Sequence, residues 1–169
     1  MKSLRHRLLS SIAIAALAFV ASNFVAPQAE AASVTYNSMY GDVLHGNIDF
    51  DSDIFHCELV DATYTPNKDT HTKRSDITGE VVGTGYTAGG AVCTFTISVN
   101  TATDQIDLQL NSVSWPSSTI TARGMVITKW RGGAASADEL IHYVDFGANI
   151  TSTNGTFTGA MATPIRIQN

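Results

Sequence analysis

The stretch from Ala91 to Asn100 reads AVCTFTISVN and carries the pattern that decides the fold. From Cys93 onward, an apolar side chain stands at every second position, and Thr or Ser fills the positions between. In a β-strand this alternation places one face on a core and the other in solvent or against a partner. Thr and Val also suit a pleated, half-buried surface. The stretch therefore predicts a β-strand.

The same alternation recurs along the chain, between turn residues such as Gly, Pro, Asn and Asp. Strands are expected at Ile54–Ala62, Glu80–Gly83, Ala91–Asn100, Gln105–Leu110, Ile120–Trp130, Leu140–Phe146, Gly155–Thr158 and Ile165–Gln168. Turns are expected at 65–67, 83–90, 103–104, 115–117, 131–133 and 154–155. A first segment around Met39 to Leu44 could form a short helix. Short strands joined by such turns predict an all-β fold, an antiparallel β-sandwich of about seven or eight strands, Ig-like or jelly-roll-like.

Alternation also selects the residues expected in the core, and its absence selects the loops. The expected core positions are Phe55, Leu59, Phe95, Ile97, Ile106, Leu108, Val126 and Ile141. Asp69–Asp76 is the most charged stretch and does not alternate, which predicts a loop or a single helical turn on the outside. Ala134–Asp138 is small and polar, and it predicts an exposed connection between two strands.

The first 31 residues have the pattern of a secretory signal peptide. A basic head, MKSLRHR, precedes an apolar run from Leu8 to Val25, and small residues at Ala29 and Ala31 mark the cleavage site. Polar residues interrupt the apolar run, so it is not the unbroken span of about 20 residues that a membrane helix needs. The sequence predicts one exported domain over residues 32–169, periplasmic, at the cell surface or extracellular, without a transmembrane segment.

The composition is poor in charge and acidic. Charged residues make up 15% of the 169-residue chain, against roughly 25% in typical soluble domains. Residues 32–169 hold seven basic and fourteen acidic residues, a net charge of −7. Phosphate binding needs clustered Lys or Arg, which is not seen here, so we expect no nucleic-acid partner. A weakly charged β-surface favours packing against protein neighbours and a homo-oligomer.

The chain has two cysteines, Cys57 and Cys93, each inside a predicted strand. An even number of cysteines in an exported chain predicts one disulfide. Two buried free thiols remain the alternative. A metal site is disfavoured, because no second Cys or His lies two to four residues from either cysteine.

Three aspartates, Asp49, Asp51 and Asp53, alternate and raise the question of a calcium loop. The helix-loop-helix calcium motif requires Gly at its sixth position and Glu at its twelfth, where this chain has Ile54 and Val60. We expect an acidic turn that leads into the strand at Ile54, and an irregular calcium site stays the alternative.

No pattern of catalytic residues stands out. The histidines after residue 31 are His45, His56, His71 and His142, and none is spaced for a helical zinc motif. His56 and His142 fall on the polar faces of predicted strands. The G-x-S-x-G pattern of a nucleophile elbow is missing. Gly83–Gly90 reads GTGYTAGG and leads into a strand, which indicates a tight β-connection and not a phosphate loop. We expect no enzyme and no cofactor.

Aromatic residues leave a carbohydrate-binding face open as an alternative, because rings stack on the apolar side of sugars. The candidates are Tyr36, Tyr40, Tyr64, Tyr86, Trp115, Trp130 and Tyr143. We expect Trp115 and Trp130 to lie in the core or at strand ends.

Several blocks in a fixed order resemble a known family. They read GNIDFDSDI at 46–54, LV at 59–60, YTPNKDTH at 64–71, DI at 76–77, GTGYTAGG at 83–90, TITAR at 119–123 and IHYVDFG at 141–147. Together they resemble small structural proteins of tailed bacteriophages, described as tail, fibre or capsid-associated, over about Tyr36 to Gly159. The resemblance implies a non-enzymatic, β-rich assembly subunit and no catalytic residues. The export signal and the cysteines differ from that family's pattern and would suit a phage-type domain placed outside a cell.

A second class shares the export signal, the single disulfide and the low charge: subunits of bacterial surface fibres. Such subunits donate an extended strand to the open sheet edge of a neighbour. Ala32–Tyr36 is the candidate donor strand here. For either class, loops Thr65–Asp76 and Gly83–Gly90 are the expected partner-binding segments, because function on a rigid sandwich concentrates in loops.

Overall fold

The computed structural model describes residues 33–168, so the predicted signal peptide lies outside the described residues. Antiparallel strands dominate this part of the chain. In chain order the elements are β1 (Val34–Thr35), α1 (Asn37–Leu44), β2 (Phe55–Val60), the 3₁₀ turn η1 (Arg74–Asp76), β3 (Ala91–Cys93), β4 (Phe95–Asn100), β5 (Gln105–Leu110), β6 (Val113–Lys129), the 3₁₀ turn η2 (Ala135–Ala137), β7 (Leu140–Gly159) and β8 (Ile165–Gln168). The predicted all-β class and the short first helix are confirmed.

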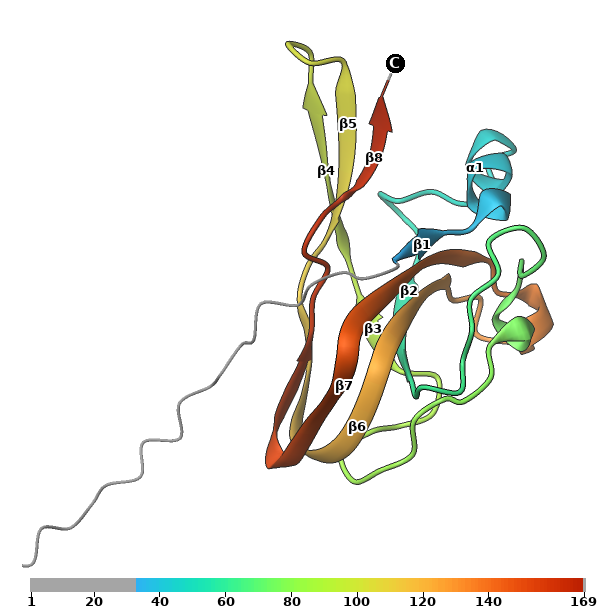
Figure 1. Ribbon diagram of the computed structural model, residues 1–169. Helices are drawn as coiled ribbons and strands as arrows, with labels where there is room; N and C mark the ends of the chain where they lie inside the picture. The colour runs from blue at the N-terminus through green and yellow to red at the C-terminus, as the bar shows by residue number, and fades with distance from the viewer. Residues whose placement is uncertain (1–32, 169) are drawn as a thin grey trace, which may run out of the picture.

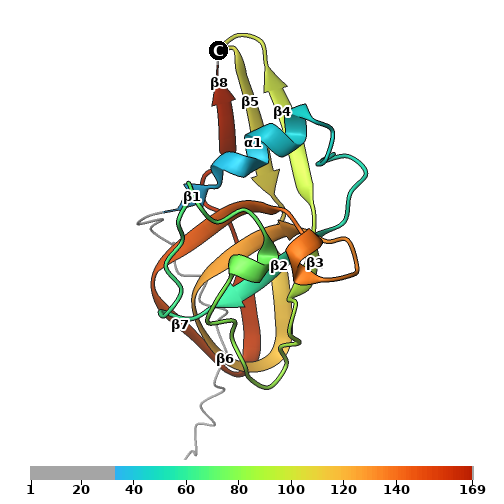
Figure 2. The ribbon, with the colours of Figure 1, turned by 90° about the vertical axis from the view of Figure 1, so that its right-hand side faces the viewer.

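The strands form two sheets. One has five strands in the order β1-β7-β6-β2-β3, and the other has three in the order β4-β5-β8. Figure 1 shows the three-stranded sheet extending upward past the five-stranded sheet, and Figure 2 shows the same extension from the side of α1. We call β4, β5 and β8 the arm and the remainder the body. The predicted two-sheet, antiparallel, sandwich-like architecture is confirmed.

The longest elements are β6 and β7, of 17 and 20 residues, which pair with each other. Strands usually have three to ten residues, and these two bend at irregularities along their pairing. The register shifts between Trp115 and Ser118 and again further along, and bulges of this kind kink and twist a strand. Both strands bend at the lower end of the body (Figure 1). The predicted turns at 115–117 and 154–155 are therefore wrong, because both lie inside these strands. Ser117 and Asn154 have φ values of 52° and 48°, which local bends require.

Two predicted strands are also corrected. Ala91–Asn100 divides at Thr94, where the chain leaves β3 in the body and begins β4 in the arm. Glu80–Gly83 is not a strand, since only an isolated bridge joins Glu80 to Val60. The predicted β5 and β8 match the structure at both ends.

The main core is formed by one face of the five-stranded sheet together with the arm residues nearest the body, such as Leu108 and Ile165. Phe55, Leu59, Leu108 and Ile141 belong to it, as expected. A second, smaller core lies on the outer face of the five-stranded sheet. It contains Tyr36, Val60, Tyr64, Val126, Leu140 and Tyr143. The five-stranded sheet is thus buried on both faces, because the long connection from β2 to β3 folds over its outer side.

The exposure of three residues differs from the sequence-based expectation, one on β7 and two on the arm. His142 was expected on a polar face, but it is 7% exposed and its Nδ1 is 2.9 Å from the hydroxyl of Thr35 on β1. Ile97 and Ile106 were expected in the core, but they are 39% and 38% exposed, and Phe95 is half-buried. The two isoleucines lie on the arm where the body does not cover them, whereas Phe95 lies at the base of the arm and its ring packs against Phe50 and Phe55. No helix within residues 33–168 is long and apolar enough to cross a membrane.

Candidate functional site

The two loops expected to bind partners both contact the five-stranded sheet, and parts of them are structural. In the first loop, 65–76, the 3₁₀ turn at Arg74–Asp76 is held by its own carboxylate: Asp76 accepts hydrogen bonds from the backbone N–H groups of Thr72 (2.8 Å) and Lys73 (3.0 Å). These bonds hold the pKa of Asp76 below its usual range. The turn carries Arg74 inward, although this stretch was expected on the outside.

Arg74 joins two buried carboxylates. Its Nε donates a hydrogen bond to Asp138 Oδ2 at 2.8 Å and lies 3.8 Å from Glu58 Oε1. Glu58 is 1% exposed and Asp138 is fully buried, although Asp138 ends a segment that was expected to be an exposed connection. The other oxygen of Asp138 accepts the backbone N–H of Arg131 at 2.9 Å. One guanidinium thus connects the first loop, strand β2 and the β6–β7 connection.

The positive charge of Arg74 does not fully offset the burial of the Glu58 carboxylate. Burial raises the pKa of Glu58 to about 7, although the positive charge of Arg74 opposes the rise. Neighbouring Glu139 behaves differently. Burial raises its pKa, but hydrogen bonds from Arg131 and Lys73 outweigh the burial and bring the pKa below its usual range. A carboxyl that titrates near neutrality can serve as a general acid, but Glu58 is sealed inside the fold, away from any substrate.

The second loop, 83–90, is a tight connection, as expected. Gly90 has φ 72°, and a Cβ there would overlap the carbonyl oxygen of Cys57. Tyr86 folds back over β2: its hydroxyl donates to Glu80 at 2.8 Å and accepts the N–H of Leu59 at 3.0 Å. Burial raises the pKa of Tyr86, and the charge of Glu80 raises it further. This loop is fixed to the sheet by its own side chains.

The aromatic residues do not form an exposed platform for sugars. Trp115 is 4% exposed and lies in the main core, as expected. Trp130 follows the end of β6 and lies between two side chains: the ring of His56 stacks on it at 4.0 Å, and the guanidinium of Arg74 lies 4.5 Å from it. Of the seven candidates, Tyr40 alone is more than a third exposed.

The aspartates at 49, 51 and 53 form a turn that leads to β2, as expected. Asp49 accepts hydrogen bonds from the N–H of Asp51 and the hydroxyl of Ser52, which lower its pKa. Asp53 pairs with the ammonium of Lys129 at 2.6 Å. Within residues 33–168, no three His, Cys, Asp or Glu side chains are grouped as metal ligands.

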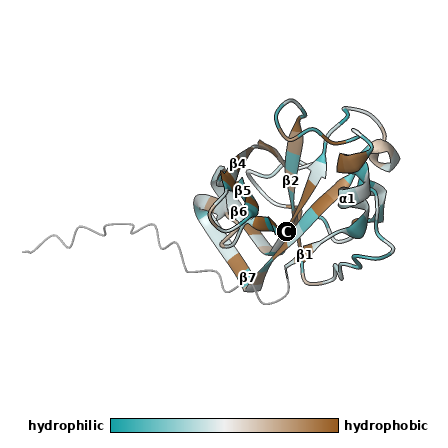
Figure 3. Ribbon diagram, turned by 90° about the horizontal axis from the view of Figure 1, so that it is seen from above, coloured by the Kyte–Doolittle hydropathy of each residue, from teal (hydrophilic) through white to brown (hydrophobic). Residues whose placement is uncertain are grey.

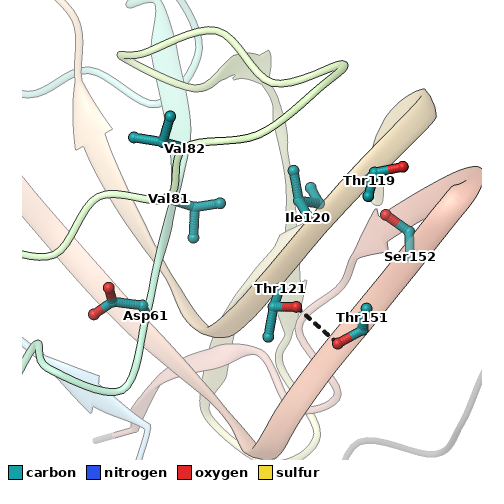
Figure 4. A pocket seen from close by; sticks show the side chains of 8 residues that line it. All are labelled: Asp61, Val81, Val82, Thr119, Ile120, Thr121, Thr151 and Ser152. Atoms are coloured by element: carbon teal, nitrogen blue, oxygen red, sulfur yellow. Dashed lines mark hydrogen bonds between the residues drawn. The ribbon is translucent and has the colours of Figure 1, made fainter.

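A pocket opens between the β6–β7 hairpin and the chain after β2 (Figure 4). Hydroxyl groups line one wall, where the hydroxyls of Thr121 and Thr151 lie 2.8 Å apart. Val81 and Val82 line the opposite wall, with Asp61 at its end. Asp61 already accepts hydrogen bonds from the backbone and side chain of Thr63. The pocket has no nucleophile paired with a base, and no aromatic ring lines it.

The arm carries the most distinctive surface. Directly opposed residues of neighbouring strands point to the same face of a sheet, so Val99, Ile106 and Ile167 form one row across β4, β5 and β8. They are 67%, 38% and 41% exposed. The next row, nearer the body, is Ile97, Leu108 and Ile165, of which only Ile97 is exposed.

The opposite face of the arm is polar. Its middle row is Ser98, Asp107 and Arg166, in which the guanidinium and the carboxylate pair at 2.8 Å. Figure 3, coloured by hydropathy, looks down on the molecule from the end at which the arm extends. The sequence identified β5 and β8 and the apolar face of β4. It did not show that the outer row of that face would lie beyond the body.

Cys57 and Cys93 form the expected disulfide, which joins β2 to β3 at the point where the chain passes into the arm. A disulfide is compatible with an oxidising, exported location. Comparisons with family models, with curated proteins and with solved structures found no match to this chain.

Proposed function

We propose that this chain is a non-enzymatic structural subunit that works outside the cytoplasm by packing against protein neighbours in a larger assembly. The observation that carries the proposal is the exposed apolar row on the arm. Val99, Ile106 and Ile167 lie side by side on one sheet face, while the reverse face is polar. Grouped apolar side chains on a protein surface mark interaction sites, whereas scattered single ones need no explanation.

The buried carboxylates support a structural role, because each is paired with a basic side chain of the same chain. Asp138 and Glu139 are paired with arginine and lysine inside the fold, and Asp53 is paired with Lys129. These carboxylates hold loops to the sheet. Reaction with a substrate would require breaking the pairs that position them.

A virion component of phage type is the form of assembly that the order of sequence blocks favours, from GNIDFDSDI at 46–54 to IHYVDFG at 141–147. The arm adds physical support, because an elongated sheet with one apolar face suits attachment to a particle. A homo-oligomer fits the same surface.

The surface-fibre alternative loses its donor strand. Val34 lies opposite Tyr143 and Thr35 opposite His142, so β1 pairs with β7 of its own chain. A subunit that donated this segment would have to release those pairs. The carbohydrate-binding alternative has no supporting surface, since the aromatic side chains mostly pack inside.

The proposal is tested with the exported, disulfide-bonded protein. We expect sedimentation velocity to show concentration-dependent self-association, or the protein to co-purify with virions or surface appendages from its native source. Gene neighbours encoding capsid, portal and tail proteins would support the virion form. Neighbours encoding a chaperone and an outer-membrane usher would support the fibre form instead. A chain that stays monomeric to millimolar concentration and is found free of any particle would contradict a structural role.

A further inference from the structure

Strand β4 is an edge strand without the usual protection. It has six residues, Phe95–Asn100, and pairs on one side with β5. Within residues 33–168, no backbone hydrogen bond reaches Phe95–Val99 from its other side. Natural proteins guard such edges with Lys, Pro, a bulge or a very short strand. The sequence FTISVN has no charged residue and no proline, and its register with β5 is regular.

The other edges in the structure are better protected. In the five-stranded sheet, the edge strands β1 and β3 have two and three residues. In the arm, β8 has four residues and carries Arg166, a charged side chain. The β4 edge is therefore the longest of the four, and, like β1 and β3, it carries no charged residue.

The lack of charge on β4 makes its edge the place where a second copy of this chain can approach with the least repulsion. The whole chain carries a net charge of −5, and the region after residue 31 carries −7, so two copies repel each other overall. Neither face of β4 carries a charge. When β4 of one copy pairs antiparallel with β4 of another, the two strands in contact carry no charge, so no like charges are brought together.

We propose that two copies join through antiparallel pairing of β4 with the partner's β4, which fuses their arms into one six-stranded sheet. This proposal rests on the structural role proposed above and specifies the contact through which the subunits join. A two-fold axis perpendicular to the sheet relates the copies, which is the usual symmetry of a dimer. This axis keeps the two apolar faces on the same side of the fused sheet. Apolar residues therefore lie opposite apolar residues, and polar residues opposite polar ones.

The register follows from the side chains. With the axis at Ser98, Ile97 lies opposite the partner's Val99 and Val99 opposite the partner's Ile97. Side chains that lie directly opposite each other across two paired strands interact and stabilise the sheet. Ser98 then lies opposite the partner's Ser98 on the polar face. The unpaired backbone N–H and C=O groups of each edge gain partners in the other.

A cysteine at the axis tests the register. Opposed Cα atoms in antiparallel strands are about 4.5–5.5 Å apart, within the span of a disulfide. Cys57 and Cys93 are already paired, so Ser98→Cys adds one free thiol. We expect most of this variant to oxidise to a reducible dimer on a non-reducing gel. Ser136→Cys, an exposed position in η2 of the body, is the matched control and should stay monomeric on the gel.

A pair of lysine variants separates edge pairing from packing of the apolar face. Val99 and Ile167 flank Ile106 in the same row, but Val99 lies on the β4 edge and Ile167 on the β8 edge. We expect Val99→Lys to weaken the dimer at least tenfold in sedimentation equilibrium and Ile167→Lys to leave it within about threefold. Circular dichroism would check that both variants fold.

The remaining outcomes are distinct. If both lysine variants dissociate the dimer equally, the faces pack and the edge pairing is overturned. If neither does, the copies meet elsewhere, which overturns the edge pairing and leaves the structural role standing. If the edge captures a strand of a different protein and the chain alone stays monomeric, the self-pairing is overturned while the structural role survives.

Discussion

Cys57 and Cys93 lie diagonally across β2 and β3, with Cys57 opposite Ala91 and Cys93 opposite Phe55. Their Cα atoms are 5.9 Å apart and both side chains are buried. The bond fixes a three-residue edge strand immediately before the chain enters β4. It therefore links the start of the arm to the central strands of the body.

Removing this bond is expected to destabilise the protein. It closes a loop with a sequence separation of 36, and a disulfide of this kind stabilises a domain by about 2–4 kcal/mol. Urea unfolding of Cys57→Ala/Cys93→Ala should show a loss of this size. Wild-type protein with reductant should show a similar loss. An unchanged midpoint in both samples would contradict the structural role of the bond.

Local patterns predicted the strands whose neighbours lie nearby in the chain, and they failed where distant segments meet. Alternation identified β5 and β8 at both ends. It could not show that β6 and β7 would run through 115–117 and 154–155, because bulges absorb the turn residues only when two long strands pair. Nor could it show that Asp138 would be buried, since its partner Arg74 is 64 residues away in the sequence. The disulfide needed only the even number of cysteines and the export signal.

Loss of the Arg74 charge should cost much more than loss of an exposed lysine. Arg74→Met keeps much of the side-chain volume but leaves Asp138 and Glu58 buried without their cation, and breaking a buried pair costs about 3–5 kcal/mol. Lys68→Met removes a pair with Asp69 in which both side chains are more than half exposed, and the cost should be below about 1 kcal/mol. Urea unfolding of both variants measures the difference. Equal losses would show that the Arg74 cluster contributes no more than a surface pair.

The Glu58 carboxyl is expected to make stability depend on pH near neutrality. Its pKa rises from 4.5 to about 7 on folding, so the folded state binds more protons than the unfolded state between these values. Stability contributed by this group therefore falls as pH rises from about 4.5 to about 7 and is constant above. Glu58→Gln removes the titration and keeps an acceptor for Thr128.

The measurement is the difference in unfolding free energy between Glu58→Gln and wild type at several pH values. The difference should move in favour of the variant by up to about 1.4 kcal/mol per pH unit across this window. Taking the difference cancels the other carboxylates, such as Asp76, whose lowered pKa acts at more acid pH. A difference that is flat from pH 4.5 to 8 would exclude a raised pKa at Glu58.

Gly124 of β6 is required because the ring of Tyr143 packs directly against the strand at this position. A Cβ at this position would lie 2.5 Å from the ring and hydroxyl of Tyr143, which is buried in the second core. Gly124→Ala should therefore cost about 1–3 kcal/mol through displacement of the ring. Gly133→Ala is the control, since a Cβ there meets nothing within 4 Å, and it should change the melting temperature little. Thermal unfolding of the two variants provides the comparison.

Two residues of β5 on the same face test how far the body covers the arm. Leu108 is 4% exposed and Ile106 is 38% exposed. In dilute, monomeric protein, Leu108→Ala should cost about 2–5 kcal/mol, as for other buried leucines. Ile106→Ala should cost about 1 kcal/mol or less, because its side chain already contacts water. Urea unfolding over a range of protein concentrations measures both.

Equal losses at low concentration would mean that Ile106 is buried in the single chain. A loss for Ile106→Ala that grows with protein concentration would mean that assembly covers the outer row of the arm, because only the associated form then benefits from the isoleucine.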